Sequence, residues 1–162
     1  SDYIEVIYSG NAQVWQNVDL MLKTIRDNLN PKIHYTILTG DLKTFEEKMI
    51  DYGIGSNNVT LKSVKPTELE YYYKKSHYGF VLRDDILVNN VACPTKIVEY
   101  LNYGIIPIVL SENIGDFKEL GYEYLNLNSF NNIFKRKSSR NSEVINLIYK
   151  KNDIDLRKLV LS

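Results

Sequence analysis

Runs of aliphatic residues alternate with amphipathic segments along most of the chain. Residues 3–10 (YIEVIYSG) and 32–40 (KIHYTILTG) are apolar, rich in β-branched residues and end in glycine, which predicts two strands. Between them, apolar residues recur at helical spacing and predict a helix over 17–29 that stops before Pro31: Val18, Leu22, Ile25 and Leu29. The chain therefore opens with a strand, a helix and a second strand.

The same alternation continues to the end of the chain. Further strands are predicted at 58–64, 77–83, 106–110 and 122–127. Helices are predicted at 42–53, 65–76, 94–104 and 115–121, with shorter ones near 129–134 and 142–150. Asp41 is a predicted N-cap, and Gly53 and Gly104 are predicted helix ends. Alternating strands and helices indicate βα units and a parallel sheet covered on both faces. We expect an α/β fold, a Rossmann-like doubly wound parallel sheet, in one domain over residues 1–162.

Composition narrows the classes of protein to which this chain can belong. Of 162 residues, 44% are hydrophobic and 25% charged, which suits a domain with a sizeable core. The net charge is zero, so no global basic field indicates nucleic acid as a partner. One cysteine, Cys93, is typical of a reducing compartment, and we expect a cytoplasmic protein without a transmembrane segment. Because the chain opens inside a strand, we expect it to be part of a longer protein.

Doubly wound sheets bind ligands at the carboxyl ends of their strands, which directs attention to the segments that follow each strand. The stretch 93–104 (CPTKIVEYLNYG) places Pro94 at the first helical position and buries one face through Ile97, Val98 and Leu101. Thr95, Lys96, Glu99 and Tyr103 fall on the opposite face. Free N–H groups, the helix dipole and the Lys96 ammonium favour an anion at this helix start.

Glu99 lies one turn deeper, where a carboxylate suits the adjacent hydroxyls of a sugar. Phosphate at the helix start and ribose beyond it together describe a nucleotide. The alternative is that Lys96 and Glu99 form an ordinary surface pair three residues apart.

The stretch 81–109 (VLRDDILVNNVACPTKIVEYLNYGIIPIV) resembles the donor-binding half of retaining GT-B glycosyltransferases of the family 4 group. Residues 58–83 are similar to the segment that precedes it in that family. The resemblance implies a single GT-B half-domain, the C-terminal domain of a two-domain enzyme. Its substrate would be a UDP- or GDP-sugar, with no further cofactor, and a missing N-terminal domain would hold a glycan or lipid-linked acceptor. It also implies polysaccharide biosynthesis, at the inner face of the membrane if the full-length protein is peripheral.

Carried over residue by residue, the resemblance implies that Glu99 binds the donor ribose and that Thr95 and Lys96 lie at the diphosphate. The backbone around Ser63 and Val64 would meet the base, and Arg83 would neutralise phosphate. No catalytic residue is assigned.

Two departures from the family pattern support an alternative. The family often has a second glutamate where this chain has Val91, and a basic residue in a loop that here reads NAQVWQ (11–16). The alternative is a non-catalytic module of the same fold that binds a nucleotide or a protein.

Other candidate chemistry in the sequence has ordinary explanations. Asp84 and Asp85 are adjacent and do not share a strand face, so we expect no metal site. His34 and His77 fit core or strand-edge positions, and Cys93 has no partnered base in the sequence. The tyrosines of 71–75 (YYYKK) point in different directions on a helix and are expected to pack rather than to stack on bases. Residues 134–142 (FKRKSSRNS) predict a solvated loop.

Overall fold

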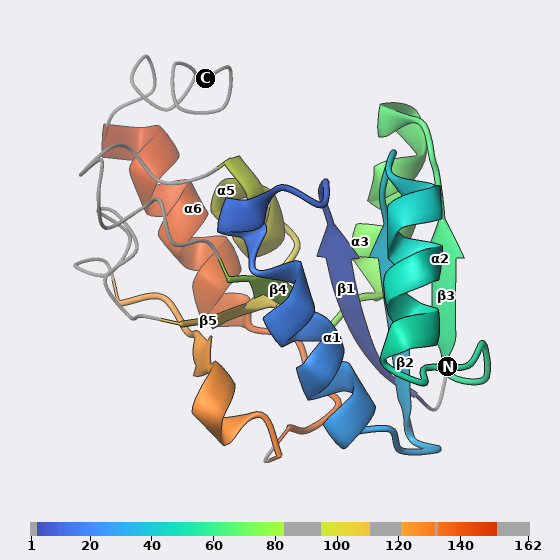
Figure 1. Ribbon diagram of the computed structural model, residues 1–162. Coiled ribbons are helices and arrows are strands. Elements are labelled where there is room, and N and C mark those ends of the chain that lie inside the picture. The colour runs from blue at the N-terminus through green and yellow to red at the C-terminus, as the bar shows by residue number, and fades with distance from the viewer. Residues whose placement is uncertain (1–2, 83–94, 111–120, 132, 152–162) are drawn as a thin grey trace.

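The computed structural model describes residues 3–82, 95–110, 121–131 and 133–151. Within these residues, six parallel strands form one sheet in the order β3-β2-β1-β4-β5-β6 (Figure 1). The strands are β1 (Ile4–Ser9), β2 (Ile33–Leu38), β3 (Val59–Lys62), β4 (Tyr78–Val81), β5 (Ile106–Val109) and β6 (Leu125–Asn126). This order, with β1 and β4 side by side at the centre, is that of a doubly wound Rossmann-like sheet, as the sequence predicts.

Helices cover both faces of the sheet. In Figure 1, α1 (Val18–Asp27) and α2 (Leu42–Asp51) lie in front of the sheet, and α3 (Leu69–Lys75) and α5 (Thr95–Asn102) lie behind it. The helix α6 (Ser139–Lys151) packs against α5. Short 3₁₀ helices occur at η1 (Val14–Gln16), η2 (Pro66–Glu68) and η4 (Leu127–Ser129).

The strands β1, β2, β4 and β5 each contribute to two apolar cores because successive side chains point to opposite faces. On β1, Val6 packs with α1 and α2, whereas Ile7 packs with α3, α5 and α6. Neither residue exposes more than 1% of its surface. Burial on both faces explains why the strand sequences read as continuous aliphatic runs rather than as alternating ones.

The element ends differ from the sequence prediction in the last third of the chain. The predicted helix near 129–134 is wrong: Asn126 Oδ1 accepts the N–H of Asn128 and Phe130 is buried, so a single turn, η4, forms before this point. The strand predicted at 122–127 pairs only through Leu125 and Asn126. The predicted helix at 115–121 lies, except for Gly121, outside the described residues.

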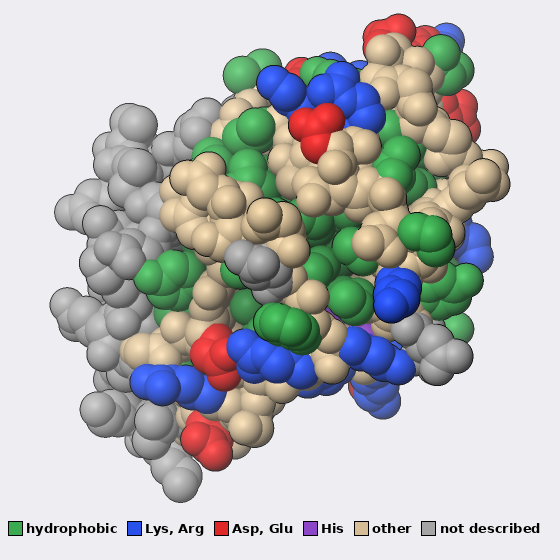
Figure 2. All heavy atoms as spheres, turned by 90° about the horizontal axis from the view of Figure 1, so that it is seen from below, with side chains coloured by type: hydrophobic (Ala, Val, Ile, Leu, Met, Phe, Trp, Pro, Cys, Tyr) green, Lys and Arg blue, Asp and Glu red, His purple; other side chains and the backbone are tan. Residues whose placement is uncertain are grey.

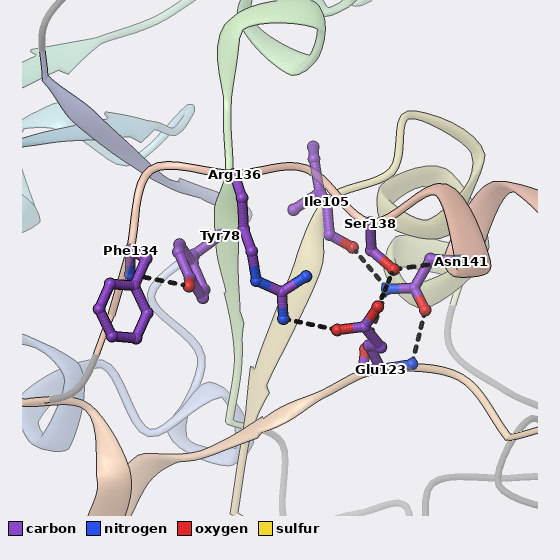
Figure 3. Close-up of polar contacts among 7 residues, drawn as sticks. All are labelled: Tyr78, Ile105, Glu123, Phe134, Arg136, Ser138 and Asn141. Carbon is purple, nitrogen blue, oxygen red and sulfur yellow. Dashed lines mark hydrogen bonds and ion pairs between the residues drawn. The ribbon is translucent and has the colours of Figure 1, made fainter.

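The predicted solvated loop at 134–142 is also wrong for its second half. Ser138 and Asn141 are 1% and 0% exposed. The Asn141 side chain donates to the carbonyls of Ile105 (3.1 Å) and Glu123 (2.9 Å) and accepts the Glu123 N–H (2.6 Å) (Figure 3). Asn141 therefore connects the start of α6 to Ile105, directly before β5, and to Glu123, before β6.

Neighbouring side chains strengthen this contact. Arg136 and Ser138 both bond the carboxylate of Glu123, and the Arg136 hydrogen bond is the main reason that the pKa of Glu123 is lowered. Lys137 Nζ donates to the carbonyls of Tyr73 (3.1 Å) and Tyr103 (2.8 Å), near the ends of α3 and α5. A cation at the carbonyl end of a helix is favoured by the helix dipole.

Candidate functional site

A pocket of about 190 Å³ lies at the carboxyl ends of β1 and β2, beside the start of α5. Backbone and small side chains form its floor: Ser9, Gly10, Thr39 and Gly40. Val64 and Pro66 form an apolar wall, and Lys96 brings a positive charge. Its place agrees with the rule that doubly wound sheets bind ligands at the carboxyl edge, near the point where the strand order reverses.

Lys96 is held by three acceptors that match the three N–H bonds of its ammonium group. Its Nζ lies 2.9 Å from Ser9 Oγ, 3.2 Å from Glu99 Oε2 and 3.3 Å from Tyr73 Oη. The Lys96 side chain is 27% exposed and that of Glu99 is 37% exposed. Lys96 thus lines the pocket, and Glu99 lies beside it in a hydrogen-bonded group that also includes Ser9 and Tyr73.

Tyr73 of α3 completes this arrangement. Its hydroxyl donates to Glu99 Oε2 at 2.9 Å, and the residue is only 3% exposed. Burial, and next the charge of Glu99, raise the pKa of the Tyr73 hydroxyl, so it stays protonated and remains a donor. Its ring packs edge-to-face on Tyr100, with centroids 5.8 Å apart.

The structure brings together three of the six residues predicted from the sequence. Lys96, Glu99 and Val64 lie at or beside the pocket, whereas Ser63 is exposed and does not line it. Thr95 is the first residue of α5. Arg83, and Val91 with it, lie outside the described residues.

Ser9 and Tyr73 are the site residues that sequence reasoning missed. Ser9 lies at the carboxyl end of β1, where doubly wound sheets bind ligands. A single serine, however, has no sequence pattern that would identify it as a site residue. The sequence predicts that the Tyr73 side chain packs, and its ring does pack on Tyr100, but its hydroxyl also donates to Glu99. Nothing in the YYYKK run (71–75) shows that one of its hydroxyls reaches a glutamate 26 residues away.

The loop after β1 adds no positive charge to the pocket. Ala12 donates its N–H to Asp41 Oδ2 at 2.9 Å, and Tyr8 Oη donates to the carbonyl of Asn11 at 2.6 Å. Asp41 is the N-cap residue of α2, as the sequence predicts, but its carboxylate bonds the loop and makes no side-chain cap hydrogen bond to the helix. Within the pocket lining, Lys96 is therefore the positive charge available to an anion.

The two histidines lie toward the amino ends of the strands, away from the pocket. His34 Nδ1 lies 2.8 Å from Glu5 Oε2, and its Nε2 lies 2.9 Å from Thr60 Oγ1. His77 Nδ1 accepts the N–H of Glu5, and burial is the main cause of its lowered pKa. Among the described residues, no three His, Cys, Asp or Glu side chains gather as a metal would need. Asp84, Asp85 and Cys93 lie outside these residues.

Comparison with known proteins gives information at the level of the fold. No family model matches the chain, and a search of the curated proteins finds no match. Among solved structures, the C-terminal domain of a glycosyl transferase group 1 family protein (LpcC) from Francisella tularensis is similar to 98% of this chain, with 12% identity and a TM-score of 0.57. The match covers 80% of that chain. The chain has the fold of a GT-B half-domain.

Two further neighbours show how widely this half-domain is used. A mutant of S. aureus TarM, solved with UDP, aligns with 99% of this chain at 13% identity and a TM-score of 0.65, over 35% of its own length. A putative UDP-N-acetylglucosamine 2-epimerase from Listeria monocytogenes aligns with 96% of this chain at 12% identity and a TM-score of 0.57, over 46% of its own length. At these identities the likeness shows the fold, and function has to be argued from the site.

Proposed function

We propose that this chain is the donor-binding domain of a glycosyltransferase and that its pocket binds a nucleoside-diphosphate sugar, a UDP- or GDP-sugar. The observation that carries this proposal is the fixed Lys96–Glu99 pair at the start of α5, at the carboxyl edge of the sheet. The lysine and the free N–H groups of the helix start favour the diphosphate, which Thr95 and Arg83 also approach in this proposal. The Glu99 carboxylate suits the ribose hydroxyls.

The apolar wall at Val64 and Pro66, beside Ser63, gives the base a surface on which to lie. In the longer protein that we propose, an N-terminal domain holds a glycan or a lipid-linked acceptor, and the sugar is transferred with retention. The cation and helix start would then stabilise the negative charge that develops on the leaving nucleoside diphosphate. The isolated domain should not turn over, because donor and acceptor must be held together for catalysis.

Titration with nucleotides tests the proposal. UDP, GDP, ADP and CMP are added to the chain and binding is followed by calorimetry or ligand-observed NMR. We expect one diphosphate to bind saturably and Glu99→Ala to weaken it about tenfold or more, since hydrogen bonds to a charged group are lost. Glu70→Ala, which removes an exposed carboxylate of α3, is the matched control and should bind as the parent does.

Equal affinity in Glu99→Ala and the parent would contradict the assignment of this site. If neither this chain nor a longer form with its upstream domain bound any of the nucleotides, the donor-binding proposal as a whole would fail.

A non-catalytic module of the same fold is the second candidate. The contact between Asp41 and Ala12 favours it, because it occupies a loop N–H with an internal carboxylate where a phosphate could otherwise bind. Transfer or hydrolysis of a sugar nucleotide by the longer protein distinguishes the two: turnover supports the enzyme, and tight nucleotide binding without turnover supports the module.

We also propose that the protein is cytoplasmic and that the full-length form is peripheral at the inner face of a membrane. Among the described residues no helix is long and apolar enough to cross a bilayer. The arrows of β1 and β3 point up in Figure 1, and the view from below in Figure 2 shows a row of Lys and Arg side chains. The segment 134–140 contains Lys135, Arg136, Lys137 and Arg140, of which Arg136 is paired with Glu123 and Lys137 bonds two carbonyls, and exposed Phe134 (69%) lies at its start. A basic segment with an exposed aromatic suits an anionic lipid surface.

A further inference from the structure

The hydroxyl of Tyr73 and the ammonium of Lys96 contact the same oxygen of Glu99. The distances to Oε2 are 2.9 Å from Tyr73 Oη and 3.2 Å from Lys96 Nζ. Among the described residues, the hydrogen bonds and the ion pair of Glu99 are all made through Oε2 and none through Oε1. Tyr73 and Lys96 therefore both hold Oε2, and we consider Oε1 as the oxygen that receives a ligand.

An oxygen of an ionised carboxylate has about two acceptor positions, so Oε1 alone can take both hydroxyls of a vicinal diol. To do so it must be held at a fixed place, because a glutamate side chain that is 37% exposed otherwise samples several rotamers. Tyr73 can provide this restraint. Its ring is buried between helices α3 and α5 and its protonated hydroxyl always donates.

Lys96 by itself is a weaker restraint. Its ammonium sits on a flexible stem and is shared with Ser9 Oγ at 2.9 Å. If the Lys96 ammonium turns toward a phosphate, its hydrogen bond to Glu99 weakens. The hydrogen bond from the Tyr73 hydroxyl then still holds the Glu99 carboxylate.

We propose that Tyr73 is a positioning residue that fixes Glu99 through Oε2 so that Oε1 accepts both ribose hydroxyls, and that it thereby sets the preference of the pocket for ribose over 2′-deoxyribose. This inference rests on the proposed function, since it concerns the same pocket. The preference for ribose over 2′-deoxyribose would then depend on α3, a helix that contains none of the site residues predicted from the sequence.

Tyr73→Phe tests the role because it removes the hydroxyl and keeps the ring that packs on Tyr100 and Tyr103. Tyr72→Phe is the matched control. Tyr72 is the next residue of the same helix and is also buried, but its hydroxyl faces Lys62 at 3.4 Å and not Glu99.

Dissociation constants are measured for UDP and GDP and for their 2′-deoxy counterparts. We expect the parent and Tyr72→Phe to prefer the ribose form by about tenfold, which is the effect of one hydrogen bond to a charged acceptor. Tyr73→Phe should weaken the ribose form and leave the deoxy form nearly unchanged, so that the preference falls to about twofold or less. A lower melting temperature with the full preference retained would show a merely structural role and overturn the proposal.

A measurement without ligand separates this inference from the proposed function. Three acceptors should slow proton exchange at the Lys96 ammonium enough for its signal to appear in ¹⁵N-correlated NMR spectra of the parent. We expect the signal to broaden or disappear in Tyr73→Phe and to persist in Tyr72→Phe. An unchanged Lys96 signal in Tyr73→Phe would overturn the positioning role even if nucleotides bind. If no nucleotide binds while the signal responds as expected, the proposed function fails and the restraint on the pair stands.

Discussion

At the scale of single residues, packing leaves little freedom around the pocket. Gly79 of β4 lies directly under the ring of Tyr100, whose hydroxyl donates to the carbonyl of Phe80 at 3.3 Å. A Cβ at position 79 would come within 2.6 Å of that ring. Tyr100 in turn supports Tyr73, so the absence of one side chain on β4 determines how closely α5 can approach the sheet.

Gly79→Ala should therefore lower the free energy of unfolding by about 1–3 kcal/mol, because an added methyl group in a packed core forces its neighbours to move. Urea denaturation followed by circular dichroism measures this change. Gly55→Ala is the control: its Cβ meets nothing within 4 Å and its stability should change by less than about 0.5 kcal/mol. Equal effects of the two substitutions on stability would show that the Tyr100 ring can move away from an added methyl group at little cost.

At the scale of elements, one buried amide holds the last helix in place. Asn141 is the only residue among those described whose side chain links the carbonyl before β5 with the backbone before β6. It lies in the first turn of α6, where Ser138 Oγ accepts its N–H at 3.1 Å. The approach of α6 to α5 therefore depends on hydrogen bonds as well as on apolar contact.

Asn141→Ala should cost about 2–4 kcal/mol, because it removes three hydrogen bonds of a buried amide and leaves the Ile105 carbonyl and the part-buried Glu123 backbone groups without this partner. Asn146→Ala, at an exposed position of the same helix, should be neutral or slightly stabilising, since alanine favours helix. Chemical denaturation of the two variants gives the comparison. A small effect of Asn141→Ala would indicate that water replaces the amide.

At the scale of the whole molecule, the net charge is zero, but the segment 134–140 is rich in Lys and Arg. The pocket lies at the carboxyl ends of β1 and β2, whereas the basic segment 134–140 bonds Tyr78 at the start of β4 and the residues before β4 and β5. These two regions can therefore serve different partners, a nucleotide and an adjoining domain at one and an anionic surface at the other.

The membrane proposal predicts binding of the chain to vesicles that contain anionic phospholipid and not to neutral ones, with loss of binding at high salt. Phe134→Ser with Lys135→Glu should reduce binding about tenfold, since each Lys or Arg near such a surface contributes about 1 kcal/mol. Ile50→Ser with Lys43→Glu changes an exposed apolar and a basic residue of α2 in the same way, and should have little effect. Vesicle sedimentation measures both, and equal loss in the two variants would assign the attraction to total charge rather than to this segment.

The sequence by itself determined the fold class, the order of the elements and one half of the candidate site. Strand and helix periodicities are local, so the alternation of aliphatic runs and amphipathic segments was sufficient to predict a doubly wound sheet. The faces of α5 follow from helical spacing in the same way, and this placed Lys96 beside Glu99.

Only the tertiary structure decided which other side chains meet that pair. Lys96 and Ser9 are 87 residues apart in the chain, and Tyr73 and Glu99 are 26 apart. Asp41 is the N-cap of α2, but its carboxylate accepts the N–H of Ala12, and Asn141 reaches Ile105 from a segment that reads as a polar loop. A single polar residue has no periodicity, and its partner is fixed only when sheet order and helix packing bring distant segments together.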